Sequence, residues 1–544
     1  MRQLVDSRTH LGSAFAIMWS VGLWAIMWLS ISPGTPENML NLASPLAIAQ
    51  GLRVALPLIA AVSTATFIVV KVIHRSPRGF GFFGPLGLLT TYGLVGLASS
   101  TMNSPNIVVA LWWGLLYLSV PIVLWRVMWS PSPLSELGRL VNQTWLIMIM
   151  AIIILSVAAA LYLDLVHKIF NPTLLLQCEK ANWVDLTGGI VRGTGVGRYA
   201  AIAGIIAIGG VWQKRWPAVW GLVLIVSMVL LLYTGARGSF IGFFAGASLV
   251  LLIYLVFAGK QVIVAALLIS LVLLFAILGT GSHSTFVREC LLLDLSPSYV
   301  VLEASEPIVS ALNLFAGSST QSSDEDGAEK EKVVIKSEAP SGTAVAPKSE
   351  APPGTAVAPK SEAPPGTAVA PKSGSSNPKS PPPEKPPNRE EAAQVAERFF
   401  TFSGRTAVWT EGWGLIKDSP LIGFGFQADR LLLGTHMHNS VLHALLQAGF
   451  LGAIPFVAAI IYGWFLFLRL VRKHAVLAIA HKHMVIQCGG VLAFLSMRAL
   501  PESTGAFFGV DWLILALILL YLQVVEYVRK HPDEEATNLN IKRG

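Results

Sequence analysis

The sequence predicts an all-helical protein that crosses a membrane about twelve times. Of its 544 residues, 53% are hydrophobic and only 13% are charged, whereas soluble domains carry about 25% charged residues. The mean hydropathy is +0.62. Stretches of about 20 apolar residues, the length that spans a bilayer as a helix, recur along most of the chain. The composition therefore excludes a soluble globular enzyme.

Twelve stretches are long and apolar enough to be spans. They lie at about residues 11–32, 54–73, 79–99, 106–129, 144–164, 199–213, 217–233, 239–258, 261–281, 441–468, 484–500 and 508–528. The sixth is short and rich in glycine. The first exceeds the usual length of a signal-peptide core and has no convincing cleavage site, so we interpret it as a retained anchor.

The distribution of Lys and Arg sets the expected orientation. Alternate loops and both termini are basic, and cytoplasmic loops are the ones enriched in Lys and Arg. This side holds 18 basic and 6 acidic residues, a charge of +12, which leaves −4 for the outer side out of a total of +8. The excess charge therefore reflects topology and does not indicate nucleic-acid binding.

The longest outer loop, residues 282–440, contains a low-complexity insert at 319–390. A 12-residue unit occurs three times there, at 336–347, 348–359 and 360–371. A segment so poor in large apolar side chains is expected to be disordered. It is either a spacer or a tolerated insertion. The remaining divisions that we expect are spans one to five with an outer loop (1–198), spans six to nine (199–281), spans ten to twelve (441–528) and a cytoplasmic tail (529–544).

Unexpected arginines lie at the outer ends of the predicted helices. They are Arg192, Arg198, Arg237, Arg405 and Arg498. Few ionisable residues fall at mid-membrane positions, where ion-coupled transporters usually place them. The outer arginines therefore point to an anion site at the membrane surface.

Three sequence contexts make these arginines candidates for binding phosphate. Arg237 precedes a helix in a tight turn, and a helix N-terminus beside a guanidinium group favours phosphate; the alternative is an interfacial arginine that snorkels. Arg405 follows the insert, where a solvated arginine at a helix start is the alternative. Arg192 and Arg198 flank the glycine-rich run 193–197, whose backbone donors can wrap phosphate oxygens.

A histidine cluster opens the tenth predicted span. Asn439 or Ser440 can cap that helix, which places His438 at a helix start on the outer face. Neighbouring guanidinium groups disfavour protonated imidazole, so His438 is a candidate general base. His436, His438 and His443 also form a pattern compatible with metal binding, but we expect no Asp or Glu partner near them. We therefore predict no metal; a purely structural histidine also stays open.

Three cysteines are too few and too scattered for a disulfide scaffold or a thiolate metal site. Cys178 and Cys290 both fall in predicted outer loops, where a disulfide between them is possible. Either cysteine can equally be buried.

Three motifs resemble the bacterial O-antigen ligase and polymerase superfamily. They are Arg237-Gly-Ser239, then Ser403-Gly-Arg405 with the Pro-Leu-x-Gly-x-Gly stretch 420–425, and then His438-Asn439 followed by Leu442, Leu445, Gly449 and Gly452. Their order around one large outer loop is also similar. The resemblance covers about residues 200–470 without the insert.

The resemblance implies a GT-C-like membrane glycosyltransferase with a large periplasmic loop between spans nine and ten. Such enzymes use a glycan donor linked to undecaprenyl pyrophosphate and need neither a cofactor nor a metal. It implies that His438 is the base and that Arg237 and Arg405 hold the pyrophosphate. Arg192, Arg198, Asn439 and Arg498 are further candidates for substrate binding. A Val-Gly-Arg-Tyr sequence at 196–199 departs from the family pattern.

The function that we expect is that of an O-antigen ligase in the bacterial inner membrane. Both termini are expected in the cytoplasm and the active site on the periplasmic face. The acceptor is expected to be lipid A-core, and the other partners are the lipid-linked donor and membrane lipid. A polymerase and a protein O-oligosaccharyltransferase are alternatives with the same chemistry. A polysaccharide or lipid transporter is the alternative from a different class.

Overall fold

A computed structural model describes residues 18–30, 45–74, 83–130, 132–162, 192–213, 216–234, 236–258 and 405–531. These residues all belong to one compact unit, which comprises residues 1–296 and 393–544. The second unit, residues 297–392, lies outside the described residues, as do the repeats and both outer-loop cysteines. All regular secondary structure in the described part is helical, as the sequence predicts.

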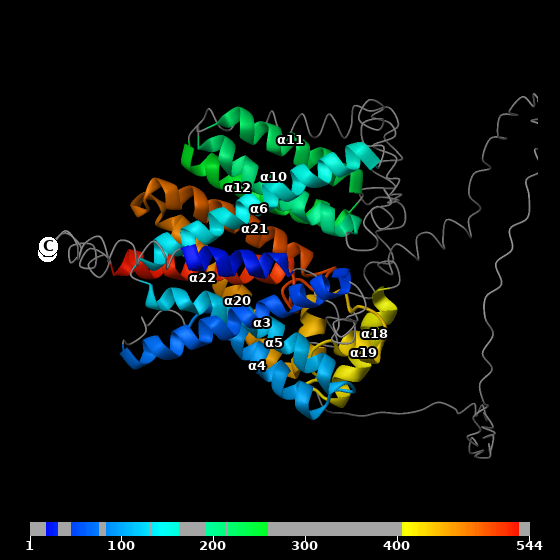
Figure 1. The fold of residues 1–544 in the computed structure, drawn as a ribbon. Helices are drawn as coiled ribbons and strands as arrows, with labels where there is room; N and C mark the ends of the chain where they lie inside the picture. The colour runs from blue at the N-terminus through cyan, green and yellow to red at the C-terminus, as the bar shows by residue number, and fades with distance from the viewer. Residues whose placement is uncertain are drawn as a thin grey trace, which may run out of the picture. The chain divides into compact units, whose positions relative to one another are not determined.

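The helices are mostly long and lie side by side (Figure 1). A short apolar helix, Met18–Leu29, comes first. The next helices are α3 (Pro45–His74), α4 (Pro85–Met102), α5 (Ile107–Trp125) with the 3₁₀ turn η1 (Arg126–Trp129), α6 (Pro133–Tyr162), α10 (Gly193–Trp212), α11 (Pro217–Thr234) and α12 (Arg237–Ala258). The last group is α18 (Arg405–Asp418), α19 (Ala428–Leu432), α20 (Ser440–Arg472), η4 (His474–Val476), α21 (Ile479–Arg498) and α22 (Val510–Lys530).

Eight helices in the described residues are long and apolar enough to cross a membrane, which confirms a multi-pass membrane protein. The predicted total of twelve spans stays a prediction. Helix α4 carries several hydroxyl side chains and the first turns of α21 contain His481-Lys482-His483, so both are less apolar than the eight. The predicted span at 261–281 lies outside the described residues.

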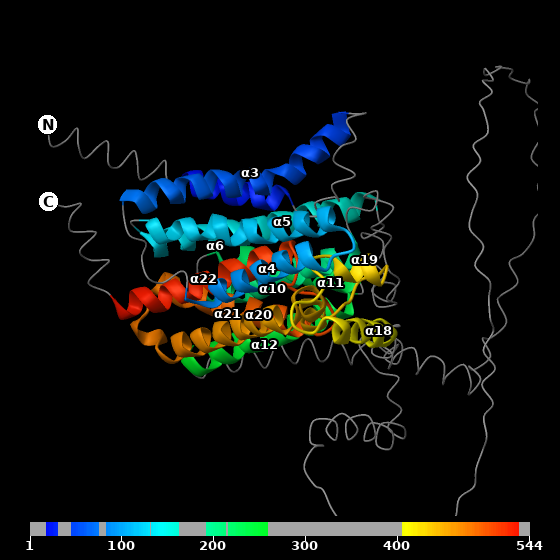
Figure 2. The same ribbon diagram turned by 90° about the horizontal axis from the view of Figure 1, so that it is seen from below.

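Helix α22 is the central helix of this bundle. It contacts α4, α5, α6, α20 and α21, and Figure 2 shows it between α6 and α20. Almost all of its residues are buried. The Trp512 ring stacks on Tyr117 of α5 at a centroid distance of 4.2 Å, and its indole N–H donates to the Tyr117 carbonyl. Burial on every side agrees with the uninterrupted run of apolar and aromatic residues at 512–522.

Helix α20 is interrupted at Gly449. This residue has φ 56° and ψ −165°, a conformation that is essentially restricted to glycine. A Cβ atom at this position would lie 2.2 Å from the carbonyl carbon of Leu421. The interruption therefore requires glycine both for its backbone conformation and for the close approach of a second chain segment.

The second segment is residues 420–425, which satisfies the backbone groups that the interruption leaves free. Its Phe424 and Gly425 N–H groups donate to the carbonyls of Leu446 and Gln447, each at 2.8 Å. In return, the Phe450 N–H donates to the Pro420 carbonyl at 2.8 Å. Buried backbone groups must be paired, so this docking explains why the Pro-Leu-x-Gly-x-Gly stretch and Gly449 occur together.

Replacing Gly449 with alanine should destabilise the bundle. The strained conformation alone costs about 1–3 kcal/mol, and the clash with Leu421 adds to it. The measurement is the thermal unfolding midpoint of the detergent-purified protein. Gly414→Ala is the matched control, because a Cβ there meets no atom within 4 Å and α18 continues through it. Equal midpoints for both variants would contradict this explanation of Gly449.

Candidate active site

The candidate residues gather at the end of the bundle that carries α18 and α19 (Figure 2). The starts of α18 and α20 and the loop 499–509 between α21 and α22 meet there. Helices α18 and α19 both pack against α20. This part of the structure therefore brings together segments that are far apart in the sequence.

The turn before α20 is fixed by its capping residue. The Asn439 carboxamide oxygen accepts from the N–H groups of Val441 and Leu442, each at 3.0 Å, which confirms the predicted cap. Its amide nitrogen donates to the Leu500 carbonyl at 3.0 Å, and the Ser440 N–H donates to the Ala499 carbonyl at 3.0 Å. The Asn439 side chain is thus occupied with holding the turn.

His438 lies in this turn with a left-handed backbone conformation, φ 51°. Its Nδ1 lies 3.3 Å from Oε2 of Glu502. The other oxygen of the same carboxylate, Oε1, accepts from Nη2 of Arg405 at 3.2 Å. One carboxylate therefore joins the predicted base to one of the predicted pyrophosphate-binding arginines. The His438 imidazole remains 32% exposed, so it can reach a substrate.

The Glu502 carboxylate is ionised in this environment. Burial opposes its ionisation, but the hydrogen bond with His438 and the charges of Arg498, His438 and Arg405 outweigh burial and lower the pKa of Glu502 to about 2. A charged carboxylate on one imidazole nitrogen fixes the tautomer and leaves the other nitrogen free to accept a proton.

Arg198 and Arg498 meet at a second carboxylate, that of Asp511 in the first turn of α22. Nη1 of Arg198 lies 3.2 Å from Oδ1 of Asp511, and Arg498 pairs with the other oxygen. Arg498 is buried, whereas Arg198 is partly exposed. With Arg405 and Glu502 included, the cluster contains three arginines and two carboxylates. It therefore carries a net charge of +1.

The remaining two predicted arginines are Arg237 and Arg192. The backbone of Arg237 begins α12, and a Cβ on the next residue, Gly238, would lie 3.6 Å from the Pro501 ring. The start of α12 thus borders the Glu502 loop. Arg192 is exposed at the N-terminal boundary of α10, and no described contact links it to His438.

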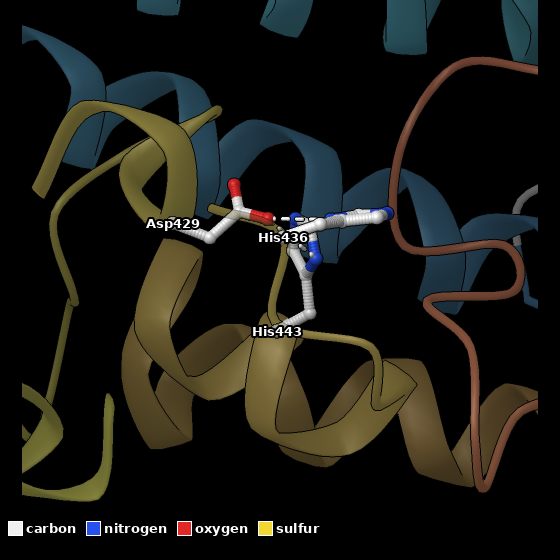
Figure 3. A group of neighbouring side chains, drawn as sticks. All are labelled: Asp429, His436 and His443. Carbon is white, nitrogen blue, oxygen red and sulfur yellow. Dashed lines mark hydrogen bonds and ion pairs between the residues drawn. The ribbon is translucent and has the colours of Figure 1, made fainter. Parts of the chain in front are cut away.

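A second polar cluster, formed by Asp429, His436 and His443, lies beside His438 (Figure 3). Nδ1 of His436 lies 2.7 Å from Oδ2 of Asp429, and the rings of His436 and His438 are 4.9 Å apart. The expectation that no carboxylate lies near these histidines is therefore wrong. Asp429 comes from α19, and the local turn that returns the chain to α20 brings it close.

Sequence reasoning missed three carboxylates: Asp429, Glu502 and Asp511. Each is buried or half-buried beside apolar helices, and a carboxylate is rarely buried without a partner. Glu502 and Asp511 also follow Arg498 closely, on the side of the membrane where the predicted charge is negative. The position of these carboxylates near arginines or apolar helices could have marked them as paired groups. Their partners could not be predicted, because most of them come from other segments of the chain.

This arrangement is suited to proton transfer beside a bound anion. A histidine with a carboxylate on one nitrogen can accept a proton on the other, and adjacent guanidinium groups favour phosphate groups.

No curated protein and no solved structure is significantly similar to the chain. A sequence model described as O-antigen ligase matches residues 385–457, which include Arg405, His438 and Gly449. This match confirms the resemblance found in the motifs: residues 385–457 of the chain are similar to the O-antigen ligase family of membrane enzymes.

Proposed function

We propose that this protein transfers a glycan from undecaprenyl pyrophosphate to an acceptor hydroxyl on the periplasmic face of the bacterial inner membrane. The single observation that carries the proposal is the Glu502 carboxylate, which contacts His438 at 3.3 Å and Arg405 at 3.2 Å. It joins a proton acceptor to a phosphate-binding group, and both are needed when a hydroxyl displaces a glycosyl pyrophosphate.

His438 acts as the general base in this proposal. Its Nδ1–H donates to Glu502, so Nε2 takes the proton from the acceptor hydroxyl. The oxygen attacks the anomeric carbon as the bond to the pyrophosphate oxygen breaks, which inverts the configuration. Glu502 stabilises the imidazolium that forms, as the carboxylate does in other carboxylate–histidine pairs.

The arginines bind the leaving group. Negative charge develops on the pyrophosphate in the transition state, and donors already in place stabilise it more than the ground state. Arg405 and Arg237 hold the pyrophosphate in this proposal, while Arg198 and Arg498 supply positive potential beside them. Because the leaving group is already good, the transfer step needs neither a metal nor a nucleotide cofactor.

The acceptor that we favour is lipid A-core, which makes the enzyme a ligase. In the experiment, the purified protein is mixed with a lipid-linked glycan donor in the presence of EDTA. One of three acceptors is then added: lipid A-core, a second lipid-linked glycan or a peptide. Release of undecaprenyl pyrophosphate with lipid A-core alone supports the ligase. Product with the second glycan alone, or with the peptide alone, would instead indicate a polymerase or an oligosaccharyltransferase.

Replacing His438 with alanine should abolish measurable transfer, because general bases typically contribute about 10² to 10⁴ in rate. Binding of the lipid-linked donor should persist. His531→Ala is the matched control, since His531 is an exposed histidine beyond the end of α22. Unchanged turnover of His438→Ala in the reconstituted assay would refute the base assignment.

Replacing Glu502 with glutamine should lower kcat by at least about tenfold, because the imidazole loses its orienting charge. It should also remove a pH-dependent part of the stability. The pKa of Glu502 falls from 4.5 to about 2 on folding, so its stabilisation is complete above about pH 4.5 and is lost as the pH falls toward 2. Unfolding midpoints measured from pH 7 to pH 3 should therefore converge for wild type and variant at low pH. A constant difference across this range would contradict an ionised Glu502.

Replacing Arg405 with glutamine should lower the transfer rate by about 10² to 10³, the usual cost of one lost donor to a developing anion. The readout is kcat with saturating donor. Arg430→Gln, a change to an exposed arginine of α19, should leave kcat unchanged. If Arg405→Gln raises only KM, then Arg405 binds the donor equally in the ground state and the transition state.

A further inference from the structure

We propose that Asp429, His436 and His443 bind a divalent transition-metal ion, of which Zn²⁺ is the representative. Their ligand atoms all lie within 4.8 Å of one another. The side chains come from α19, from the turn before α20 and from the first turn of α20. This site is separate from the base, whose carboxylate partner is Glu502.

The hydrogen bonds of Gln447 determine how His443 presents its ring nitrogens. Every polar atom of the Gln447 amide is satisfied only when its oxygen accepts from Nε2 of His443 and from the Gln427 N–H, and its nitrogen donates to the Ala506 carbonyl. The proton of His443 is therefore on Nε2. The lone pair on Nδ1 accepts from the Ser503 hydroxyl at 2.8 Å, and Oδ2 of Asp429 lies on the same side of the ring. A bound ion would replace the Ser503 hydroxyl as the partner of Nδ1.

Two electron-rich atoms face each other as a result. Nδ1 of His443 lies 3.5 Å from Oδ2 of Asp429, which is too long for a hydrogen bond. Asp429 is fully buried, and its Oδ1 has no hydrogen-bond partner among the described residues. A buried carboxylate facing a lone pair is the arrangement that a cation stabilises.

One of the ligand distances already matches a tetrahedral ion. Bonds of about 2.0 Å separate tetrahedral ligand atoms by about 3.3 Å, close to the 3.5 Å between Asp429 and His443. The 2.7 Å between Asp429 and His436 must open by about 0.6 Å to reach that spacing. His436 can provide this movement, because it lies in the turn before α20 and is 21% exposed. Two imidazoles and one carboxylate favour Zn²⁺ over Mg²⁺ or Ca²⁺, which prefer oxygen ligands.

The surrounding contacts are those of a metal site rather than of a simple ion pair. Metal-bound histidines donate their second ring N–H to an oxygen atom, which fixes the tautomer, and Gln447 accepts that bond from His443. His436 is two residues from His438. An ion held there would order the turn that carries the base without contacting the substrate.

The test uses full-length protein purified in detergent and stripped with EDTA. Calorimetric titration with ZnCl₂ should give one tight site per chain, and Zn²⁺ should raise the unfolding midpoint. Asp429→Asn and His436→Gln should weaken Zn²⁺ binding by more than about 100-fold, since the loss of an outer-shell partner already costs 10- to 100-fold. Asp418→Asn, at an exposed aspartate of α18, is the matched control and should bind like wild type, as should His438→Gln.

Three outcomes would overturn the proposal: no saturable Zn²⁺ binding, equal binding by wild type and Asp429→Asn, or loss of binding in His438→Gln. X-ray absorption spectroscopy of the wild-type protein with one equivalent of Zn²⁺ identifies the ligands directly. This measurement does not depend on the folding of any variant. Two imidazoles in a four-coordinate shell support the site, and a shell without imidazole refutes it. The glycosyl transfer of the previous section is tested by His438→Ala in EDTA, so either proposal can fail without the other.

Discussion

The attachment of the start of α20 to the loop between α21 and α22 determines the geometry of the candidate active site. The amide of Asn439 and the N–H of Ser440 bond to the Leu500 and Ala499 carbonyls. The Ser440 hydroxyl lies 2.9 Å from the carbonyls of Glu502 and Thr504. Because both segments end rigid helices, these bonds set the distance between His438 and the Glu502 carboxylate. A change in this attachment would separate them without altering either helix.

The interruption of α20 at Gly449 also helps to position the candidate active site. Residues 420–425 dock on the broken helix through backbone hydrogen bonds, and this docking positions the chain that leads into α19. Asp429 therefore reaches His436 and His443 through main-chain contacts that require glycine at position 449. Stability and the second polar cluster thus depend on one backbone feature.

Charge balance gives the end of the bundle its chemical character. Arg198 and Arg498 share Asp511, and Arg405 shares Glu502 with His438. Asp511 stabilises the buried guanidinium group of Arg498, which is costly to bury alone, and both carboxylates pair with partly exposed arginines. The one surplus positive charge then remains available to an anionic ligand. This arrangement makes the arginines at once structural and suited to a pyrophosphate.

Several features were predictable from local sequence. Apolar length predicted the eight helices that are suited to spanning, because hydrocarbon admits only helices with internally paired backbones. Residue type and position predicted the Asn439 cap and the grouping of Arg405 and His438 at one end. The motifs predicted a resemblance to the O-antigen ligase and polymerase superfamily, and the match to residues 385–457 supports it.

Tertiary structure alone decided which charged groups are partners. Glu502 is 64 positions from His438 and 97 from Arg405, and no periodicity relates residues on different helices. The same holds for Asp511, which pairs with arginines of α10 and α21, and for Asp429, whose approach to His443 depends on the docked segment. The sequence by itself determined a helical membrane protein that resembles this superfamily, because hydrophobic length and short motifs are local properties. Only packing decided that carboxylates connect its base and its arginines, because ion pairing depends on distance in space.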